Sequence, residues 1–394
     1  MALDAPASLK AVCFALLDLK AACVRLRFAD GRALQFGEPG GPEAELIIRN
    51  PRFARRVLLS GDIGFAEGFM AGEWDTPDLS ALLTVLSANG DRIARMIKGN
   101  LLVRAVNLVR HAGRRNTRAG ARKNIHEHYD LGNRFYSAWL DPTMTYSSAR
   151  FDAPGQALKD AQLAKYRALA AHLELKPGER VLEIGCGWGG FAEIAAREYG
   201  AEVVGVTISE AQKKFADERM AAAGLSDRVE IRLQDYRDVR GAFDKVASIE
   251  MFEAVGERYW PAYFAKISDV LRPGGAAALQ IITIRDDLFS AYRRRADFIQ
   301  RYIFPGGMLP SVSRLEAETE RAGLVWRKLE AFGQSYADTL AQWSQSFTAK
   351  WDEIRSLGFD ERFKQLWRFY LSYCEAGFRT GRTDVVQLSL AKPA

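Results

Sequence analysis

The sequence predicts an α/β fold with a doubly wound, Rossmann-like parallel sheet, preceded by a smaller α+β domain. Val181–Ile184 is a short apolar run, which is typical of a strand buried on both faces of a parallel sheet. The glycine-rich stretch Gly185–Gly190 follows directly, and glycines allow positive φ and close approach of a ligand. From Arg180 onward, strand-like and helix-like segments alternate. Together these features indicate a nucleotide-type site at the carboxyl end of a central strand.

Composition places the chain among ordinary globular proteins. It has 394 residues, enough for two domains, with 48% hydrophobic and 26% charged residues. Its formal net charge of +6 suits an anionic partner, either nucleic acid or an acidic membrane surface. No apolar run is long enough to span a bilayer, and charged residues interrupt the N-terminus where a signal peptide would be apolar. The four cysteines are scattered without metal or disulfide spacing, so we expect reduced cytoplasm and no metal site.

The first domain, residues 1–115, is predicted to be a small α+β unit. Alternation in Val24–Phe28 and Ala33–Phe36 around Asp30-Gly31 predicts a hairpin. Leu46–Ile48 is predicted to be a further strand. The remaining patterns predict helices over Ala11–Leu19 and Phe53–Leu59.

A basic segment, Arg92–Lys123, follows this unit. It contains ten Lys or Arg residues and no acid, beside an apolar face at roughly helical spacing. One interpretation is a solvated linker helix; the other is a basic amphipathic segment that lies on anionic lipid. The segment lacks interleaved aromatic residues, so we expect no nucleic-acid partner.

The second domain, residues 116–394, carries the alternating pattern. Helices are predicted at Phe191–Tyr199, Glu210–Ala223, Ala262–Leu271, Ser313–Ala322, Thr339–Leu357 and Glu361–Phe378. Strands are predicted at Arg180–Ile184, Glu202–Ile208, Val229–Leu233, Phe243–Ser248 and Ala276–Ile284, with Arg272–Gly275 as a turn before the last of these. Val325–Phe332 and Val385–Ala391 are expected to be the final antiparallel strands. The aromatic stripe on the last two helices is most simply core, and it could also line an acyl tunnel.

The glycine stretch allows two ligands. Gly185, Gly187 and Gly190 match the G-x-G-x-x-G pattern of dinucleotide sites, but one match is a weak signal. Glu183 completes the E-x-G-x-G pattern of class I S-adenosylmethionine (SAM) methyltransferases. The next strand ends in Thr207 rather than in the carboxylate that binds a dinucleotide ribose. SAM is therefore favoured over NAD or FAD, and also over a glycine turn that binds nothing.

Several motifs together resemble the cyclopropane-fatty-acyl-phospholipid synthase family. They are His128–Asn133, Tyr146–Ser148, Ile184–Gly190, Val206–Ser209, Gln234–Asp238, Met251–Glu253 and Tyr302–Ser311. The resemblance implies a class I SAM-methyltransferase fold and SAM-dependent alkylation of the double bond in an unsaturated acyl chain of a membrane phospholipid. It also implies a homodimer, a lipid-binding first domain and peripheral association of a cytoplasmic enzyme with the inner face of the membrane.

The resemblance further implies which residues bind SAM. Tyr146 and Ser147 would lie above the cofactor, and Glu183, Gly185, Cys186, Gly187 and Gly189 would form its loop. Thr207, Ser209 and Gln212 would lie near the ribose and methionine, with Asp235 and Tyr236 beside the adenine.

The chemistry requires a dry site and a base. Attack of an alkene on the sulfonium methyl leaves a carbocation on the acyl chain, which aromatic faces can stabilise. The candidates are Phe135, Tyr136, Tyr146, Trp188, Tyr302 and Phe304, each of which is more simply core when taken alone. Loss of a proton from the transferred methyl closes a cyclopropane ring. Loss from a neighbouring carbon leaves a methyl or methylene branch, as in a furan fatty acid precursor.

By resemblance, the family's base is a bound bicarbonate held by Cys, Glu, His, Tyr and a backbone amide. The corresponding positions here are Ser148, Glu253, Gln280, Tyr336 and the amide near Ile282, so that Cys and His are both changed. Ala254 replaces a further His, and Glu250 stands where the family tends to have Gly.

Two carboxylates, Glu250 and Glu253, thus lie close together in the sequence. Neighbouring like charges raise one pKa and make a competent base. We expect Glu253 to orient the base, and Glu250 either partly replaces bicarbonate or is a surface or capping carboxylate. The altered positions favour the branched product, whereas the family's usual reaction favours the ring. An RNA methyltransferase and a non-enzymatic lipid-binding protein are the other interpretations.

Overall fold

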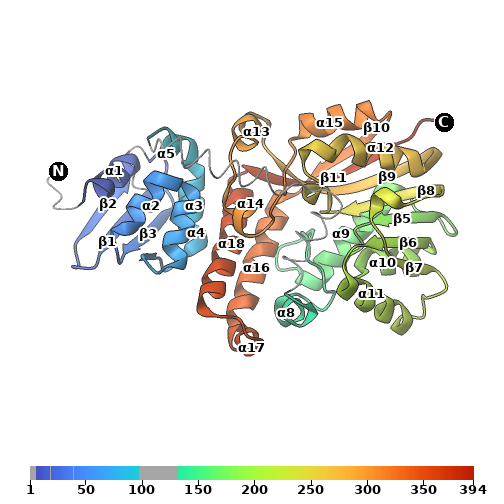
Figure 1. Cartoon of the computed structure of the whole chain (residues 1–394), viewed down its shortest axis with the longest axis horizontal. Coiled ribbons are helices and arrows are strands. Elements are labelled where there is room, and N and C mark those ends of the chain that lie inside the picture. The colour runs from blue at the N-terminus through green and yellow to red at the C-terminus, as the bar shows by residue number, and fades with distance from the viewer. Residues whose placement is uncertain (1–5, 18, 39, 97–130) are drawn as a thin grey trace. The chain divides into compact units, whose positions relative to one another are not determined.

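The structure is a computed structural model that describes residues 6–17, 19–38, 40–96 and 131–394 (Figure 1). It divides into two compact units. The first comprises residues 1–113, 291–303 and 351–382, and the second comprises residues 114–290, 304–350 and 383–394. Residues 291–303 and 351–382 therefore belong to the same unit as the N-terminal part, whereas a single division of the chain at residue 115 assigns them to the second domain. Most of the basic segment Arg92–Lys123 and the residues before Leu131 lie outside the described residues.

The first unit contains a four-stranded sheet in the order β2-β1-β3-β4. Strand β1 pairs antiparallel with β2 and parallel with β3, and β3 pairs antiparallel with β4. The predicted hairpin is confirmed, because Val24 pairs with Phe36 across it. The strands are β1 (Cys23–Phe28), β2 (Ala33–Gly37), β3 (Glu43–Ile48) and β4 (Trp74–Asp75).

Helices complete this unit, and an aromatic cluster forms part of its core. The Trp74 ring stacks on Phe65 at 4.1 Å, and Phe369 and Phe298 pack at 4.8 Å. The aromatic stripe of the last long helix is thus core, as expected. The helices are α1 (Ala7–Leu16), α2 (Arg52–Ser60), α3 (Asp62–Met70), α4 (Leu79–Ala88), α5 (Gly90–Met96), α14 (Phe298–Tyr302), α17 (Trp351–Ser356) and α18 (Glu361–Arg379).

The second unit is organised around a seven-stranded sheet in the order β10-β11-β9-β8-β5-β6-β7. Strands β7, β6, β5, β8 and β9 are parallel, whereas β11 pairs antiparallel with both of its neighbours, β9 and β10. The bounds are β5 (Arg180–Ile184), β6 (Glu202–Thr207), β7 (Val229–Leu233), β8 (Phe243–Ile249), β9 (Leu271–Ile284), β10 (Val325–Ala331) and β11 (Thr383–Ala391). The order reverses between β5 and β8, and a ligand of a doubly wound sheet binds at such a point.

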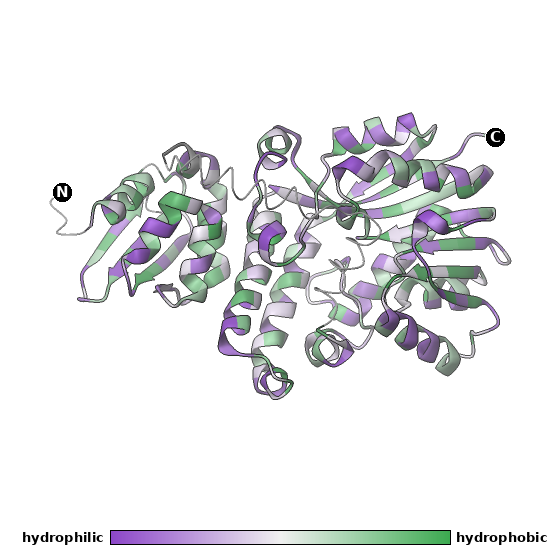
Figure 2. Cartoon of the chain, viewed as in Figure 1, coloured by the Kyte–Doolittle hydropathy of each residue, from purple (hydrophilic) through white to green (hydrophobic). Residues whose placement is uncertain are grey.

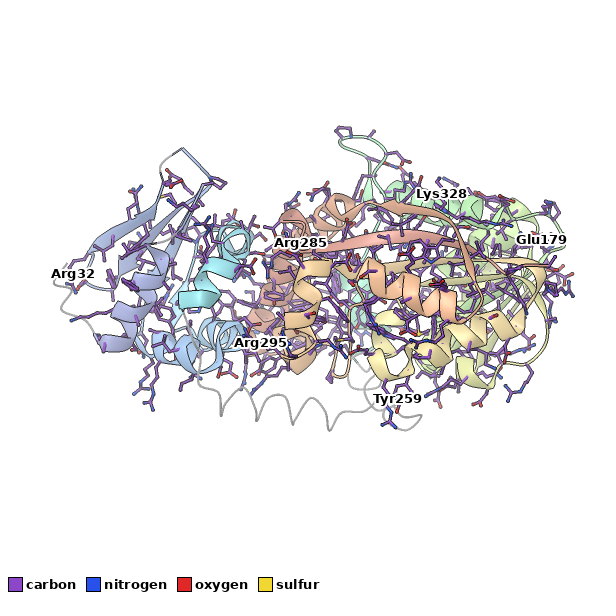
Figure 3. All side chains as sticks on the ribbon, turned by 90° about the horizontal axis from the view of Figure 1, so that it is seen from above. Arg32, Glu179, Tyr259, Arg285, Arg295 and Lys328 are labelled. Atoms are coloured by element: carbon purple, nitrogen blue, oxygen red, sulfur yellow. The ribbon has the colours of Figure 1, made fainter. Side chains whose placement is uncertain are left out.

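Helices cover both faces of this sheet (Figure 1). The helices of this unit are α8 (Asn133–Trp139), α9 (Leu158–Leu173), α10 (Gly190–Tyr199), α11 (Glu210–Ala222), α12 (Trp260–Val270), α15 (Val312–Arg321) and α16 (Gly333–Ala349). Three short 3-10 turns, at Tyr236–Asp238, Phe252–Ala254 and Glu257–Tyr259, and α13 (Asp286–Tyr292) complete the elements of the described residues. In Figure 2 the strands are largely hydrophobic, whereas α11 and α15 also carry hydrophilic residues. Exposed charged side chains such as Arg285 and Lys328 are labelled in Figure 3.

Three sequence-based boundaries were wrong. The helix predicted at Ala11–Leu19 begins four residues earlier, at Ala7, and ends at Leu16. The predicted turn Arg272–Gly275 lies inside β9, because a register shift lets Leu271 pair with Phe243 before the regular pairing resumes at Ala276. The helix predicted from Thr339 begins six residues earlier, at Gly333, and ends at Ala349 before a separate helix α17. Tyr336 is therefore helical. None of the described helices is long and apolar enough to cross a membrane.

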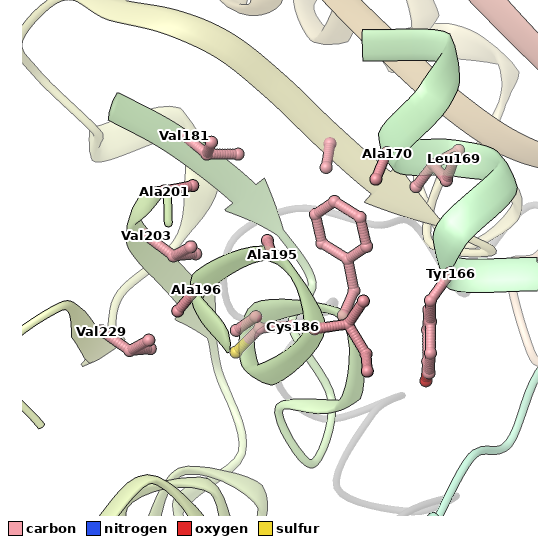
Figure 4. Close-up of a cluster of buried hydrophobic side chains, with 14 of the residues drawn as sticks. Tyr166, Leu169, Ala170, Val181, Cys186, Ala195, Ala196, Ala201, Val203 and Val229 are labelled. Atoms are coloured by element: carbon pink, nitrogen blue, oxygen red, sulfur yellow. The ribbon is translucent and has the colours of Figure 1, made fainter. Parts of the chain in front are cut away.

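The core of the second unit around β5 is a hydrophobic cluster to which α9 and α10 contribute buried side chains (Figure 4). Phe191 lies at the start of α10 and is 1% exposed, beside Leu169 and Val181. This packing fixes the helix that follows the glycine stretch.

We expect Phe191→Ala to lower the free energy of unfolding of the second unit by about 3–5 kcal/mol, because it removes apolar contacts and leaves a cavity. Leu233→Ala is the control, since Leu233 is 43% exposed and its truncation should change stability by no more than about 0.5 kcal/mol. Urea denaturation measures both. Equal losses for the two variants would show that Phe191 is not part of a close-packed core.

Candidate active site

The loop after β5 has the geometry of a ligand cradle. Gly185, Gly187 and Gly189 have φ values of +80°, +53° and +82°. A Cβ atom on Gly185 would lie 2.7 Å from Met251 Cγ, and one on Gly189 would lie 3.0 Å from Met220 Cε. At Gly187 no atom lies within 4 Å of that position, so this glycine borders open space. A ligand can therefore approach the backbone at Gly187.

The side chains of Glu183 and Cys186 are buried, which does not favour direct contact with a ligand. The Cys186 thiol lies in the hydrophobic cluster near Val203, and its burial raises the pKa of the thiol (Figure 4). Glu183 is 2% exposed, and burial raises the pKa of its carboxyl to about 8 despite the amide of Ala192 and the charge of Arg219. Only the backbone of Cys186 is left to contact a ligand.

The residues predicted beside the ribose form a hydrogen-bonded group after β6. Thr207 Oγ1 donates to Gln212 Oε1 at 2.8 Å, and the Ser209 amide donates to Thr207 Oγ1 at 3.2 Å. Ser209 Oγ in turn accepts from the Gln212 amide and caps α11. The capping therefore brings these three predicted residues together.

After β7, Asp235 and Tyr236 lie at the start of a 3-10 turn. The Asp235 carboxylate accepts from Arg237 Nε at 2.9 Å and from Arg237 Nη2 at 2.6 Å, so it is held in a bidentate pair. Burial raises the pKa of Tyr236 to about 12, which keeps its phenol neutral.

Aromatic rings gather beside the loop that contains Tyr146. The ring centroid of Tyr146 lies 5.2 Å from that of Tyr136 and 5.3 Å from that of Trp343. The centroids of Tyr136 and Trp188 are 5.2 Å apart. Trp343 also packs edge-on against Tyr336 at 6.2 Å. Of the predicted aromatic candidates, Phe135, Tyr136, Tyr146 and Trp188 thus belong to one cluster.

Tyr302, another of these candidates, belongs to the first unit. Its hydroxyl donates to Glu67 Oε1 at 2.6 Å. Tyr302 is therefore held within the first unit and is not part of the cluster around Tyr146.

Glu250 is the centre of the second half of the site. It follows β8 with φ +48°, a left-handed conformation that costs a non-glycine residue about 1–2 kcal/mol. Its Oε1 accepts from the Ser148 amide and from Gln280 Nε2, both at 2.8 Å, and its Oε2 accepts from the Tyr336 hydroxyl at 2.6 Å. Glu250 is therefore a half-buried carboxylate that three protein donors hold, and not a surface or capping carboxylate.

A glutamine pair supports this arrangement from the sheet. Gln280 on β9 pairs directly with Gln387 on β11, and Gln387 Nε2 donates to Gln280 Oε1 at 3.1 Å. This bond orients the Gln280 amide so that its nitrogen faces Glu250. Both glutamines are 0% exposed. Gln387 is a residue that sequence reasoning missed, because pairing between β9 and β11 is not visible in their spacing.

Glu253 lies one 3-10 turn after Glu250. Its Oε1 accepts from the Ile282 amide, and within the described residues its buried Oε2 has no hydrogen-bond partner. Burial, together with the charge of Glu250, raises the pKa of Glu253 to about 8. Burial also raises the pKa of Glu250, whereas Lys165, Tyr336 and the other donors oppose that rise. The environments of the two carboxyl groups therefore differ: Glu250 has three donors that stabilise its anion, whereas Glu253 has one.

The predicted bicarbonate does not fit these residues. Two donors assigned to it by resemblance, Gln280 and Tyr336, are bonded to the Glu250 carboxylate, and the Ile282 amide is bonded to Glu253. The Ser148 hydroxyl donates to the Ala149 carbonyl, so only the Ser148 amide faces the carboxylate.

The sheet order, the glycine loop and the open space at Gly187 define a class I SAM-dependent methyltransferase. Comparison with known proteins gives the particular family: the sequence model of mycolic acid cyclopropane synthetase matches residues 116–388. This chain belongs to that family of SAM-dependent fatty acid methyltransferases and cyclopropane synthases, as the resemblance implied.

Individual relatives agree. The chain is 41% identical to the tuberculostearic acid methyltransferase UfaA1 of Mycobacterium tuberculosis, over 94% of this chain and 88% of the relative. It is 38% identical to cyclopropane-fatty-acyl-phospholipid synthase of Escherichia coli, over 90% and 89%. Among solved structures, mycolic acid cyclopropane synthase CmaA1 in complex with SAH and CTAB aligns with a TM-score of 0.65 and 30% identity, over 69% of this chain and 98% of that one.

We expect Gly187→Ala to weaken SAM binding by about tenfold or more, equivalent to about 1.4 kcal/mol, because a methyl group would enter the open space of the cradle. Gly224→Ala is the matched control: Gly224 also has positive φ (+68°) with no atom within 4 Å, but it ends α11. Both variants carry the same backbone strain. Calorimetry measures SAM affinity, and equal affinities of the two variants would remove Gly187 from the site.

Proposed function

We propose that this enzyme transfers the methyl group of SAM to the double bond of an unsaturated fatty acyl chain in a membrane phospholipid. Family membership supports an acyl substrate, and the names of the two relatives above refer to a fatty acid and to a fatty-acyl phospholipid. These relatives favour an acyl chain over RNA, and they favour catalysis over lipid binding alone.

The proposal depends most on the Glu250 carboxylate and its three hydrogen bonds. The base of this reaction must sit within reach of the carbocation, and the donors at Ser148, Gln280 and Tyr336 hold Glu250 where the resemblance puts bicarbonate. A strained backbone at Glu250 persists only because the surrounding contacts fix it, which is typical of functional positions. We therefore assign Glu250 as the general base and Glu253 as its neighbour that orients the site.

The proposed reaction is a methyl transfer followed by the loss of one proton. The alkene π electrons form a bond to the methyl carbon, and the electrons of the breaking S–CH₃ bond return to sulfur, which gives neutral S-adenosylhomocysteine. The other alkene carbon becomes a cation. The Glu250 carboxylate takes one proton from the chain, and the electrons of that C–H bond neutralise the cation. A carboxylate whose pKa is raised by burial is a stronger base for this transfer than an exposed one.

Two groups of residues would prepare the substrates. The glycine loop at Gly185–Gly189 would hold SAM, with Thr207, Ser209 and Gln212 toward its ribose and methionine. The aromatic cluster around Tyr146 would surround the reacting carbons, because aromatic faces stabilise a cation and exclude the water that would hydrate it.

We propose an unsaturated methyl- or methylene-branched chain as the product. Loss of a proton from the carbon next to the cation leaves a methyl branch on a double bond, whereas a 1,2-hydride shift followed by loss of a proton from the methyl group leaves a methylene branch. A protein carboxylate at this position differs from the base that the resemblance assigns to ring formation, and the relative UfaA1 is named for tuberculostearic acid. A cyclopropane ring is the other product of the same cation, and the Escherichia coli relative is named for it.

The location follows from the substrate. We propose that the enzyme acts in the cytoplasm, as a homodimer bound peripherally to an anionic membrane, with the first domain and Arg92–Lys123 as the contact. The support is the ten basic residues of that segment beside its apolar positions.

We expect Glu250→Gln to lower kcat about 10²- to 10⁴-fold, as loss of a general base does, with SAM affinity unchanged. Glu253→Gln should also lower turnover. Glu198→Gln is the control, because Glu198 pairs with Arg167 at the surface and should keep full activity. Turnover with vesicles of unsaturated phospholipid, followed with radiolabelled SAM, measures all three.

The same assay in bicarbonate-free buffer tests the base directly. The wild-type enzyme should keep its rate there, and mass spectrometry and NMR should find a branched chain. A Glu250→Gln variant with near wild-type activity, or a bicarbonate-dependent enzyme that makes only cyclopropane, would contradict the assignment.

We expect binding to vesicles that contain anionic phospholipid to weaken steeply with salt, since exposed charges are screened over about 10 Å at 0.1 M. Charge reversal at Arg104, Arg110 and Arg114 should abolish most of this binding. Reversal at Lys159, Lys176 and Lys214, which are exposed on the second unit, changes the net charge equally and should have little effect. Co-sedimentation measures binding, and equal loss in both triple variants would contradict a local contact.

A further inference from the structure

Lys165 is a buried basic side chain that the proposed reaction does not use. It lies on the inward face of α9 and is 0% exposed, in line with Ala161, Gln162 and Leu169. A lysine is almost never completely buried unless its charge is paired, because an ammonium group loses its hydration inside a protein. Its position therefore requires an explanation.

The contacts of the ammonium group are unusual. Nζ donates to Ser147 Oγ at 2.6 Å and lies 4.3 Å from the centroid of the Tyr166 ring. In the part of the chain that the structure describes, no carboxylate lies within ion-pair distance of Nζ. The cation is thus held by a neutral hydroxyl and an aromatic face, not by a salt bridge.

One hydrogen-bonded route leads from Lys165 through the loop to Glu250. Lys165 Nζ donates to the Ser147 hydroxyl. Gln162 also holds Ser147, because its Nε2 donates to the Ser147 carbonyl at 2.9 Å. The next amide, that of Ser148, donates to Glu250 Oε1 at 2.8 Å. Helix α9 therefore sets the position of this donor.

A second route runs through the sheet. The Lys165 carbonyl accepts from Gln387 Nε2 at 3.1 Å, and the same nitrogen donates to Gln280 Oε1 at 3.1 Å. Gln280 Nε2 then donates to Glu250 Oε1. This second route begins at the backbone carbonyl of residue 165, so it anchors Gln280 to α9 without depending on the lysine side chain.

Electrostatics links the same two residues. Burial lowers the pKa of Lys165 to about 7, and the negative charges of Glu250, Asp141 and Glu183 act against this shift. In return, the charge of Lys165 is the main influence that opposes the effect of burial on the pKa of Glu250, followed by Tyr336 and the Ser148 amide. Glu253 is the like-charged neighbour of Glu250.

We propose that the Lys165 side chain is a positioning group that keeps Glu250 ionised by its charge and correctly placed through Ser147. The proposal rests on Glu250 as the base of the proposed function. Lys165 itself does not touch the reacting atoms; its ammonium group supplies positive charge near the Glu250 carboxylate and holds the Ser147 hydroxyl, next to the Ser148 amide that donates to that carboxylate.

The test compares Lys165→Met with wild type over a range of pH. Without the cation the pKa of Glu250 rises, so that less carboxylate is present at a given acidic pH. The acidic limb of the kcat profile should therefore move to higher pH, with about a tenfold loss at acidic pH for each unit of movement and recovery under alkaline conditions. SAM affinity should stay within about twofold of wild type. A merely structural role would lower kcat equally at every pH.

A matched control is available on β8. Lys245 is also buried, at 8% exposure, but it lies 3.6 Å from Glu179. Lys245→Met should leave the acidic limb where it is in wild type. If Lys165→Met does not fold, Lys165→Gln replaces it, because a neutral amide can still donate to Ser147 Oγ.

Infrared difference spectroscopy supplies a readout that does not depend on turnover. The protonated carboxyl band of Glu250, identified by its loss in the Lys165→Met/Glu250→Gln double variant, should persist to higher pH in Lys165→Met than in wild type. An unchanged acidic limb together with an unmoved band would overturn the proposal. An active Glu250→Gln enzyme would overturn only the base assignment, since the band would still report whether Lys165 holds Glu250 ionised.

Discussion

The site depends on one carboxylate that three protein donors hold. Glu250 accepts hydrogen bonds from the Ser148 amide, the Gln280 side chain and the Tyr336 hydroxyl, which come from a loop, from β9 and from α16. Each donor requires its element to lie in one place, and β9 in turn is positioned by its pairing with β8 and β11. A buried anion without these bonds would be too costly to keep, so the antiparallel strand β11 and α16 are as necessary to the site as the parallel sheet.

Two carboxyl groups share this region and have different environments. Glu250 has three donors and a cation nearby, whereas Glu253 has the Ile282 amide and a buried oxygen with no partner among the described residues. This difference favours the charged form at Glu250, whereas burial and the charge of Glu250 raise the pKa of Glu253. A pair of this kind can take a proton at one position without competition from the other.

The residues that differ from the pattern implied by the resemblance, Ser148, Glu250 and Gln280, contact one another in the structure. A bicarbonate would need donors that the carboxylate of Glu250 already occupies, and Glu250 stands in a left-handed conformation that glycine adopts without cost. Ser148 and Gln280, which stand where the resemblance implies Cys and His, accompany this change. The Ser148 side chain turns to the Ala149 carbonyl, and Gln280 provides an amide nitrogen that a carboxylate can use. Membership of the family and a protein-supplied base are therefore compatible.

The sequence by itself determined the fold class, the place of the cofactor loop and nearly every strand of the second unit, because hydrophobic period and glycine position are local properties. It also identified Glu250 and Tyr336 as candidates, by comparison of short motifs. Only the tertiary structure decided that Glu250 is half-buried and that Cys186 faces the core. Only the tertiary structure, too, brought Lys165 and Gln387 to the same carboxylate from positions 85 residues before it and 137 after it. The reason is physical: strand pairing and helix packing join residues that are distant in the chain, and no spacing in the sequence records which side chains then meet.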